Sequence, residues 1–428
     1  TYSRNPFDLR PLYLCSDGEG AVQLKAFVLC GGLGTRVSDI LGNKPKSLLN
    51  FDDHEFLEIL LNQLCILPLE EIILLAGFRG DQIRQKYHLK VQNGIRLYVE
   101  IEDSPLGTLG CFQRVQDRLG EKQIIVNGDT YLEFQNLSCW EELSDKGNSQ
   151  NILFPIYKKN VTRYGSLTLS NEKVKSFNEK SSKDGPGYIN SGVYILTKDA
   201  IKDGLSRRFS SLEKQLFVKL TEDNNLFYKK DFIKTSFDIG TIPSHDSFLK
   251  QWMDRPSVRC IFWDRDNTIH FDKGHNTIFD PAMMNNTFLQ IANHASSKSI
   301  KNFIVSNQSG IAKGKFKEQD TLNFHFELKA WALNRGIVVD DFQFCPHHPK
   351  GIISAYTQSC ECRKPGTAMI EQLTKRWNIN LSKSLYVGDS VVDSELANKL
   401  DIKFFHLDMK KERLNDVKKL EDYVNAII

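Results

Sequence analysis

The sequence lacks any apolar run long enough to cross a membrane. Its most hydrophobic stretch, residues 66–78, is interrupted by Glu70 and Glu71, whereas a membrane-spanning helix needs about 20 apolar residues. The net charge of the 428 residues is only +3, which gives no indication of binding to nucleic acid or to an anionic membrane. We therefore expect small molecules as partners, with no nucleic acid and no membrane, and leave a homo-oligomer open.

The start of the sequence does not resemble a signal peptide, and the chain contains no internal repeat or low-complexity tract. Residues 1–20 are polar and include Asp8 and Arg10, unlike the apolar core of a signal peptide. Nine cysteines in a long chain without an export signal favour free thiols and metal ligands over disulfides. The sequence therefore predicts a cytoplasmic protein.

Short apolar runs alternate with amphipathic segments along the chain. Strands are expected at 25–30, 72–76, 95–101, 123–127, 258–263, 303–306, 342–345, 384–387 and 403–407. Helices are expected at 56–67, 80–87, 109–119, 320–335 and 367–377. This alternation predicts an α/β fold in which mainly parallel sheets are flanked by helices. Residues 151–194 are richer in strand and turn sequence, which favours antiparallel additions.

A break in this alternation predicts two domains. It falls at residues 254–257, where Asp, Arg, Pro and Ser follow one another before a new apolar strand. We expect an N-terminal extension at 1–24, a Rossmann-like domain at 25–254 and a second α/β domain at 258–428. The chain is long enough for a full core in each domain.

A glycine-rich turn follows the first predicted strand. Gly31, Gly32 and Gly34 let backbone N–H groups approach a polyphosphate closely, and Arg36 and Lys46 add positive charge against its oxygens. The alternative for the glycines alone is a tight loop that needs positive φ. The basic residues that follow favour a nucleotide site.

Two carboxylates end other predicted strands of this domain. Asp129 follows Asn127-Gly128, and Asp238 precedes Ile239-Gly240. Together they suit Mg²⁺, which prefers a few carboxylates plus phosphate oxygens. A single aspartate at a strand end is more often a turn or cap residue. The interpretation of the two aspartates as a metal site therefore depends on the glycine turn in the same domain.

These residues resemble the sugar-1-phosphate nucleotidylyltransferase family over about residues 25–253, and most closely its heptose-1-phosphate guanylyltransferases. Shared motifs include GGLGTR at 31–36, Pro105-Leu106-Gly107-Thr108 and Asn190-Ser191-Gly192. Cys30 and Ser47 depart from the family pattern.

The resemblance implies that a sugar 1-phosphate oxygen attacks the α-phosphorus of an NTP, with GTP expected and CTP left open. It implies nucleotide contacts from Gly31, Gly32, Gly34, Thr35, Arg36, Lys46, Pro105, Gly107, Thr108 and Asp129. It implies sugar-phosphate contacts from Glu179, Lys180, Asn190 and Gly192, and Mg²⁺ on Asp129 and Asp238.

The second domain carries a different constellation. Asp264 ends an apolar strand and Asp266 follows it, a pair suited to a carboxylate nucleophile and a general acid–base. Such a pair alone also occurs in solvated loops. Three further elements favour catalysis, namely Ser306-Asn307, Lys364 and Gly388-Asp389. The last of these supplies another carboxylate for Mg²⁺.

Cys345-Pro346-His347-His348 and Cys360-Glu361-Cys362 lie between Ser306 and Lys364, and of the two adjacent histidines we expect His347 to be a metal ligand and His348 to be its neighbour. The spacing of Cys345, His347, Cys360 and Cys362 fits a closed tetrahedral zinc site in the loop 345–362. Unrelated buried cysteines are the alternative. With four protein ligands the zinc would be structural, and it would fix the loop that presents Arg363 and Lys364.

The second set resembles the haloacid dehalogenase superfamily over about residues 259–408, and within it the heptose-1,7-bisphosphate phosphatases, whose nearest relatives are histidinol phosphatases. Asn267 stands where glycine is frequent in that family. The resemblance implies an aspartyl-phosphate intermediate on Asp264. It implies Mg²⁺ on Asp264, Asp266 and Asp389, and substrate phosphate contacts from Ser306, Asn307, Arg363 and Lys364.

Both resemblances point to heptose. A phosphatase that removes the C7 phosphate makes the 1-phosphate that the other domain needs, so the sequence predicts a bifunctional enzyme of nucleotide-activated heptose synthesis. Two alternatives stay open. One is a hexose-1-phosphate or CTP-using transferase fused to a histidinol-phosphatase-like enzyme, and the other is a non-catalytic sensor of nucleotide sugars.

Overall fold

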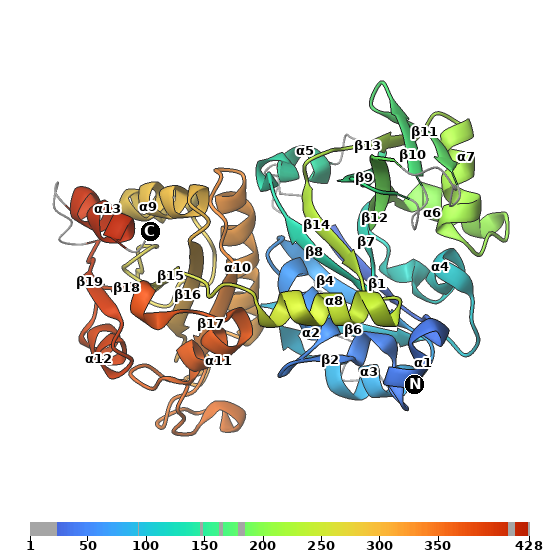
Figure 1. The fold of residues 1–428 in the computed structure, drawn as a ribbon. Helices are drawn as coiled ribbons and strands as arrows, with labels where there is room; N and C mark the ends of the chain where they lie inside the picture. The colour runs from blue at the N-terminus through green and yellow to red at the C-terminus, as the bar shows by residue number, and fades with distance from the viewer. Residues whose placement is uncertain are drawn as a thin grey trace.

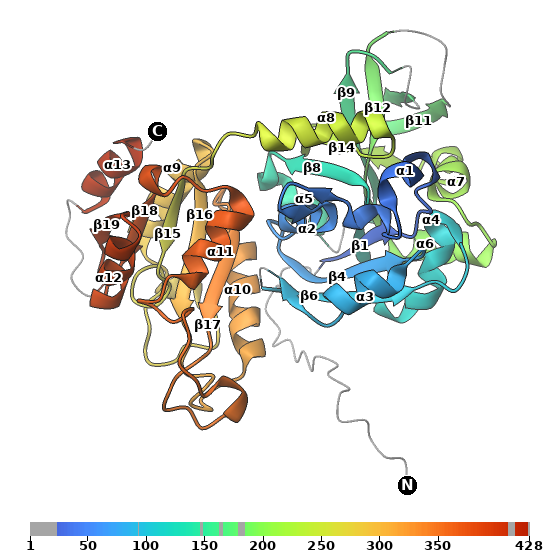
Figure 2. The ribbon, with the colours of Figure 1, turned by 60° about the horizontal axis from the view of Figure 1, so that its bottom comes forward.

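The chain forms two α/β units that lie side by side, each built on its own sheet (Figure 1; Figure 2). The computed structural model describes residues 24–92, 94–145, 149–161, 166–178, 185–409 and 416–426. In both units the sheet is covered by helices, which confirms the predicted fold class.

The first sheet is parallel at its centre, with a larger antiparallel part at one side and the short antiparallel strand β5 at the other edge. Its ten strands follow the order β10-β11-β13-β9-β12-β7-β1-β4-β6-β5. The parallel strands are β7 (Lys122–Asn127), β1 (Leu24–Cys30), β4 (Leu69–Ala76) and β6 (Ile95–Ile101). The other strands are β5 (Val91–Gln92), β9 (Asn151–Lys158), β10 (Ser166–Ser170), β11 (Lys173–Asn178), β12 (Gly187–Thr197) and β13 (Leu226–Tyr228). Strand β12 runs antiparallel to both β7 and β9, so the antiparallel additions predicted for 151–194 are confirmed.

Helices pack on both faces of this sheet. One face buries apolar residues of α2 (Phe56–Leu64), α3 (Gly80–Tyr87) and α5 (Trp140–Ser144). The other face buries residues of α4 (Gly107–Gly110), α6 (Lys198–Ser206) and α7 (Phe217–Glu222). Smaller elements complete the unit: α1 (Ser38–Leu41), the hairpin β2 (Asn50–Phe51) and β3 (His54–Glu55), and the ribbon of β8 (Thr130–Phe134) with β14 (Ile233–Asp238).

The α-helix predicted at 109–119 is wrong. The chain instead leaves α4 for a 3-10 segment, Cys111–Arg118, which is interrupted by non-helical backbone at Val115. Leu109, Phe112, Val115 and Leu119 are all buried, and over so short a stretch their spacing fits a 3-10 helix as well as an α-helix. The apolar pattern alone therefore does not distinguish the two kinds of helix.

The second sheet is entirely parallel. Its order is β17 (Asp341–Cys345), β16 (Lys301–Asn307), β15 (Cys260–Trp263), β18 (Leu385–Gly388) and β19 (Lys403–His406). Helices α9 (Asn286–Ser297), α10 (Glu318–Leu333) and α13 (Asp416–Ala426) contribute to the core on one face, and α11 (Ala368–Trp377) and α12 (Val391–Lys399) to that on the other. Because the strands are parallel, their carboxyl ends meet at one edge of the sheet, where α/β proteins place their sites.

The link between the two units is short and packed. Helix α8 (Ile242–Met253) begins at a capping box of Thr241 and Ser244. Beyond the helix, the N–H of Val258 donates to the carbonyl of Asn378 at 2.8 Å. One group of buried apolar residues includes Val28 of β1, Phe262 of β15 and Leu333 of α10, so the two cores are continuous.

Helix α10 lies between the two sheets in both views (Figure 1; Figure 2). Its buried Lys329 donates to the carbonyl of Cys65, which caps the C-terminus of α2, a place where the helix dipole favours a cation. Nearer its start, Gln319 accepts from Arg96 of β6 at 2.5 Å. The described helices include none that is long and apolar enough to cross a bilayer.

We predict that Lys329→Ala lowers the free energy of unfolding by about 2–4 kcal/mol, because it leaves a buried carbonyl unpaired and a cavity between the domains. Lys375→Ala is the matched control, since Lys375 pairs with Asp53 across the same junction at 3.7 Å but is 65% exposed. The control should cost less than about 1 kcal/mol. Urea denaturation followed by circular dichroism measures both, and equal losses would contradict this view of the junction.

Candidate active sites and candidate metal centre

The glycine turn of the first domain lies directly after β1 and is open to solvent. Gly34 has φ +63°, a left-handed conformation that glycine adopts without strain. Thr35 and Arg36 are exposed on the 3-10 turn that follows. The predicted basic residue Arg36 therefore stands free to reach a phosphate from the rim of the turn.

Glu102 joins this turn to the segment 105–108. Its Oε2 accepts from the N–H of Leu106 at 3.0 Å, and a Cβ placed on Gly31 would come within 2.7 Å of its Oε1. A side chain at position 31 would therefore displace the carboxylate of Glu102 from the turn. Burial raises the pKa of Glu102. Glu102 was not predicted as a site residue from the sequence. Its only local indication is that an acidic residue directly follows β6.

Lys46 lies between the two predicted magnesium carboxylates. Its Nζ is 2.6 Å from Asp129 Oδ2 and 3.6 Å from Asp238 Oδ1. The ribbon of β8 and β14 brings the aspartates together, because Asp238 is paired with Thr130 in its register. Burial, followed by repulsion from Asp129, raises the pKa of Asp238. Two carboxylates and a cation at one strand edge fit a site for Mg²⁺ and triphosphate oxygens.

Of the predicted sugar-phosphate residues, two can be placed. Asn190 donates to the hydroxyl of Tyr194 at 2.5 Å and accepts from the N–H of Gly192 at 2.9 Å, so β12 holds both in a fixed turn. Glu179 and Lys180 lie outside the described residues.

Gly107 and Thr108 pack against residues 210–213. A Cβ on Gly107 would lie 2.4 Å from the carbonyl oxygen of Ser210. The hydroxyl of Thr108 accepts from the N–H of Leu212 at 2.9 Å and donates to Glu213 at 3.0 Å. In this structure both residues tie the segment 105–108 to residues 210–213.

In the second domain, a buried lysine pairs with the predicted nucleophile. Lys364 Nζ is 2.5 Å from Asp264 Oδ1 and 2.7 Å from Asp393 Oδ1, and it also donates to Val305 O and Tyr386 OH. Burial opposes the charge of Lys364, but Asp264 raises its pKa well above the usual value. Burial raises the pKa of Asp264 to about 7 despite this lysine. The site thus holds a closely paired, almost fully buried carboxylate and ammonium.

A group of three carboxylates suited to a metal ion lies around this pair. Among the described residues, ligand atoms of Asp264, Asp389 and Asp393 all lie within 4.8 Å of one another. Burial, followed by repulsion from Asp393, raises the pKa of Asp389 to about 6. Such excess negative charge fits a divalent cation with oxygen ligands. The predicted ligand Asp266 is outside this group, since its carboxylate contacts Arg265 and Gln308.

Asp393 was not predicted from the sequence. It is fully buried, accepts from Tyr386 OH at 3.0 Å and, through its other oxygen, from the N–H of Ser390 at 3.2 Å. In the sequence it reads as the last residue of an ordinary capping box at the start of α12. The sequence did contain one indication that Asp393 belongs to the site. It lies four residues after Asp389, on a helix that begins at the same strand end.

Asn307 and Ser306 are placed at the carboxyl end of β16. Asn307 accepts from the N–H of Lys364 at 3.0 Å and donates to its carbonyl at 3.1 Å, so it fixes the backbone of the lysine. The Ser306 hydroxyl accepts from Gln308 Nε2 at 2.7 Å. Arg363 donates to the carbonyl of His347 at 3.4 Å, which ties it to the cysteine-rich loop.

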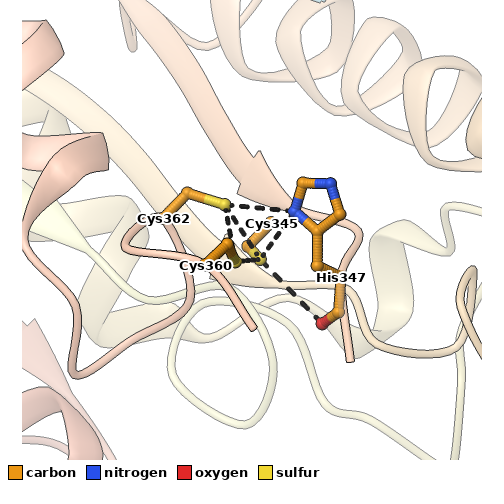
Figure 3. Close-up of side chains that lie close together, drawn as sticks. All are labelled: Cys345, His347, Cys360 and Cys362. Carbon is orange, nitrogen blue, oxygen red and sulfur yellow. Dashed lines mark hydrogen bonds between the residues drawn. The ribbon is translucent and has the colours of Figure 1, made fainter. Parts of the chain in front are cut away.

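The four predicted zinc ligands converge on one point (Figure 3). The sulfur atoms of Cys345, Cys360 and Cys362 lie 3.1–3.5 Å apart, and His347 Nδ1 is 3.2 Å from the sulfur of Cys362. These separations exclude disulfides, in which sulfurs are about 2 Å apart. They are slightly shorter than the ligand edges of a tetrahedron with Zn–S bonds of about 2.3 Å. His348 instead accepts from the N–H of Lys350, as expected of a neighbour.

The comparisons with known proteins follow this division into two sites. Residues 25–254 match the family model described as nucleotidyl transferase. The D-glycero-beta-D-manno-heptose-1,7-bisphosphate 7-phosphatase of Yersinia pestis is 36% identical over 142 residues, which make up 33% of this chain and 75% of that protein. The D-glycero-alpha-D-manno-heptose 1-phosphate guanylyltransferase of Campylobacter jejuni is 32% identical over 210 residues, which make up 48% of this chain and 87% of that protein.

Among solved structures, HddC from Yersinia pseudotuberculosis is 29% identical with a TM-score of 0.47, over 54% of this chain and 100% of that chain. Both family resemblances seen in the motifs are confirmed by the two curated relatives. The chain therefore belongs to the nucleotidyl transferase family through residues 25–254, and it is also a member of the family of the Yersinia pestis phosphatase.

Proposed function

We propose that this chain is a bifunctional enzyme of nucleotide-activated heptose synthesis. Residues 258–428 would remove the 7-phosphate of D-glycero-D-manno-heptose 1,7-bisphosphate, and residues 25–254 would then transfer a nucleotidyl group to the heptose 1-phosphate. The main support is that one chain is related both to a heptose-1,7-bisphosphate 7-phosphatase and to a heptose 1-phosphate guanylyltransferase, since removal of a 7-phosphate leaves the kind of 1-phosphate that the second activity uses.

The phosphatase step uses the buried carboxylates. An oxygen of Asp264 attacks the C7 phosphorus, the bond from phosphorus to the sugar oxygen breaks, and Asp266 gives its proton to that oxygen. Water then attacks the aspartyl phosphate and gives a proton back to Asp266, which releases phosphate and frees Asp264. Lys364 offsets the charge of the nucleophile. Mg²⁺, held by Asp264, Asp389 and Asp393, would neutralise the phosphoryl oxygens.

The transfer step needs no general base, because the attacking phosphate oxygen is already an anion. That oxygen attacks the α-phosphorus of the nucleotide and pyrophosphate leaves. Arg36 and Lys46 position and neutralise the triphosphate. Asp129 and Asp238 would hold Mg²⁺ against it, where Lys46 now spans the two carboxylates.

The chemistry also constrains the anomer. The names of the two relatives differ at C1, beta in one and alpha in the other. Neither step breaks a bond at the anomeric carbon, since one acts at C7 and the other at a phosphate oxygen. Both sites of this chain must therefore accept the same anomer.

Glu102 supports guanine as the base. A carboxylate is an acceptor only, and guanine presents two adjacent donors, N1–H and N2–H, on one edge. Cytosine, adenine and uracil each present an acceptor beside their single donor there. The position of Glu102 against Gly31 places an acceptor beside the turn that would receive the nucleotide.

The function is tested by combining both steps. With either anomer of the bisphosphate, GTP and Mg²⁺, phosphorus NMR should show a nucleotide-linked heptose without a 7-phosphate. We predict that Asp264→Asn forms none of it from the bisphosphate, with phosphatase turnover lowered about 10⁴-fold or more, the scale for removal of a nucleophile. From heptose 1-phosphate the same variant should form it at the normal rate. The exposed Asp401→Asn serves as control, and loss of both activities in folded Asp264→Asn would refute separate sites.

We predict about one tightly bound zinc ion per chain, held by the four converging ligands. Cys360→Ser should lose it and lower phosphatase activity more than transferase activity, because the loop leads directly to Arg363 and Lys364. Elemental analysis measures the metal, with Cys139→Ser as the control thiol outside the cluster. Zinc-free wild-type protein prepared without chelator would disprove the site.

We predict that Glu102→Gln lowers kcat/KM for GTP by about 10-fold to 100-fold, since a lost two-donor contact to a base is worth about 1–3 kcal/mol. The amide replaces one acceptor with a donor, so the relative rate with CTP or UTP should rise. Glu100→Gln is the control, since Glu100 lies two residues earlier, in β6, and is paired with Arg114. An unchanged preference among GTP, CTP and UTP would show that Glu102 does not recognise the base.

A further inference from the structure

Arg265 stands between the two aspartates of the phosphatase site and is almost completely buried, with 1% of its surface exposed. Arginine is seldom buried without a specific partner. Here its guanidinium contacts Asp266, Gln308 and the ring of Phe324. The mechanism above uses neither Arg265 nor Gln308.

The side chains of Arg265, Asp266 and Gln308 form a closed triangle of hydrogen bonds. Arg265 Nε donates to Asp266 Oδ1 at 2.8 Å, and its second terminal nitrogen donates to Gln308 Oε1 at 3.0 Å. Gln308 Nε2 donates to the other oxygen of Asp266 at 2.8 Å. Both oxygens of Asp266 are therefore held, and the amide orientation of Gln308 is fixed by needing an acceptor toward arginine and a donor toward aspartate.

The triangle is anchored to parts of the fold that do not carry the reacting groups. The guanidinium lies over the ring of Phe324 on α10, 4.5 Å from its centre, a cation–π contact that arginine makes more often than lysine. Gln308 Nε2 also donates to Ser306 Oγ at 2.7 Å. Carboxylate, guanidinium and amide are thus tied to α10 and to the end of β16.

This arrangement separates Asp266 from the carboxylates around Lys364. Asp264, Asp389 and Asp393 gather within 4.8 Å of one another, and Asp266, only two residues from Asp264, is engaged elsewhere. Besides Arg265 and Gln308, the carboxylate of Asp266 is contacted only at the long distance of 3.5 Å by Ser306 Oγ among the side-chain hydrogen bonds of the described residues, so the two shorter contacts contribute most to its orientation. Proton transfer requires a fixed position within hydrogen-bond reach of the leaving oxygen.

We propose that Arg265 and Gln308 are positioning residues that hold the carboxylate of Asp266 for proton transfer in the phosphatase reaction. The inference rests on the proposed function, in which Asp266 protonates the sugar oxygen in the first step and takes a proton from water in the second. Both residues act through Asp266, and their loss should slow proton transfer while leaving substrate binding unchanged.

The test compares Arg265→Met, Arg265→Lys and Gln308→Leu with Asp266→Asn. For heptose 1,7-bisphosphate, kcat should fall about 10²-fold or more in Arg265→Met and Gln308→Leu, the scale of general acid–base catalysis, with KM unchanged. Arg265→Lys keeps the charge but not the two-nitrogen fork, so its kcat should be intermediate. Arg376→Met removes another arginine–aspartate pair of this domain, in which a half-buried Arg376 lies 2.7 Å from the buried Asp341, and should leave kcat unaltered.

Rapid mixing with p-nitrophenyl phosphate distinguishes positioning from general disruption. Nitrophenolate leaves without a proton, so the first step should stay fast and the second should stall. Arg265→Met and Gln308→Leu should then release a burst of about one nitrophenolate per chain, and acid-quenched mass spectrometry should find one phosphoryl group on the chain. Loss of both steps in equal measure, without a burst, would overturn the inference.

The same measurements keep this inference apart from the proposed function. Impaired Asp266→Asn beside normal Arg265→Met and Gln308→Leu would overturn the positioning role alone. Normal turnover of the bisphosphate in Asp266→Asn would overturn the acid–base assignment of the proposed function, and the positioning role with it.

Discussion

The buried ammonium group of Lys364 is the interaction on which the second site depends. Charges are costly to bury unless they are paired and hydrogen-bonded, and Lys364 has carboxylate, carbonyl and hydroxyl acceptors around it. It allows Asp264 and Asp393 to approach each other inside the protein. Four carboxylates at this strand edge face the two buried cations Lys364 and Arg265, and the remaining negative charge suits a divalent ion.

The first site follows the same electrostatic rule under weaker burial. Lys46 joins Asp129 to Asp238, but these carboxylates are 39% and 52% exposed, against 9% or less for Asp264 and Asp393. Water can therefore solvate the carboxylates of the first site when Lys46 moves toward a phosphate. The phosphatase site is built in advance around fixed charges, whereas the transferase site has room to rearrange around a large nucleotide.

Much of this was predictable from the sequence, because glycines, carboxylates and basic residues at strand ends mark parallel-sheet sites. The four residues proposed to bind zinc were also recognisable in the sequence, since their spacing is distinctive, and the structure brings them together. The residues that were missed resemble ordinary structural ones: Asp393 reads as a helix cap, and Glu102 as one acidic residue after a strand. Their roles depend on tertiary contacts between distant segments, which local patterns do not contain.

Arg265 and the segment 109–119 show two further limits. Nothing local indicates that an arginine beside two aspartates is buried under the ring of Phe324 on a helix some sixty residues later in the chain. The apolar residues of 109–119 recur at a period that fits both kinds of helix over so short a stretch, and only packing against the sheet decides between them.

The junction at α10 has a consequence for how this chain can be divided. Separating the halves near Pro256 would expose Leu67, Phe326 and Phe342 around Lys329, which together line a cavity between the domains. A free phosphatase half would then carry an apolar patch, and a free transferase half an uncapped helix end at Cys65. Two separate proteins would need polar residues in place of the apolar ones on both sides of this surface. The residues of the junction are therefore adapted to a chain in which the two domains stay joined.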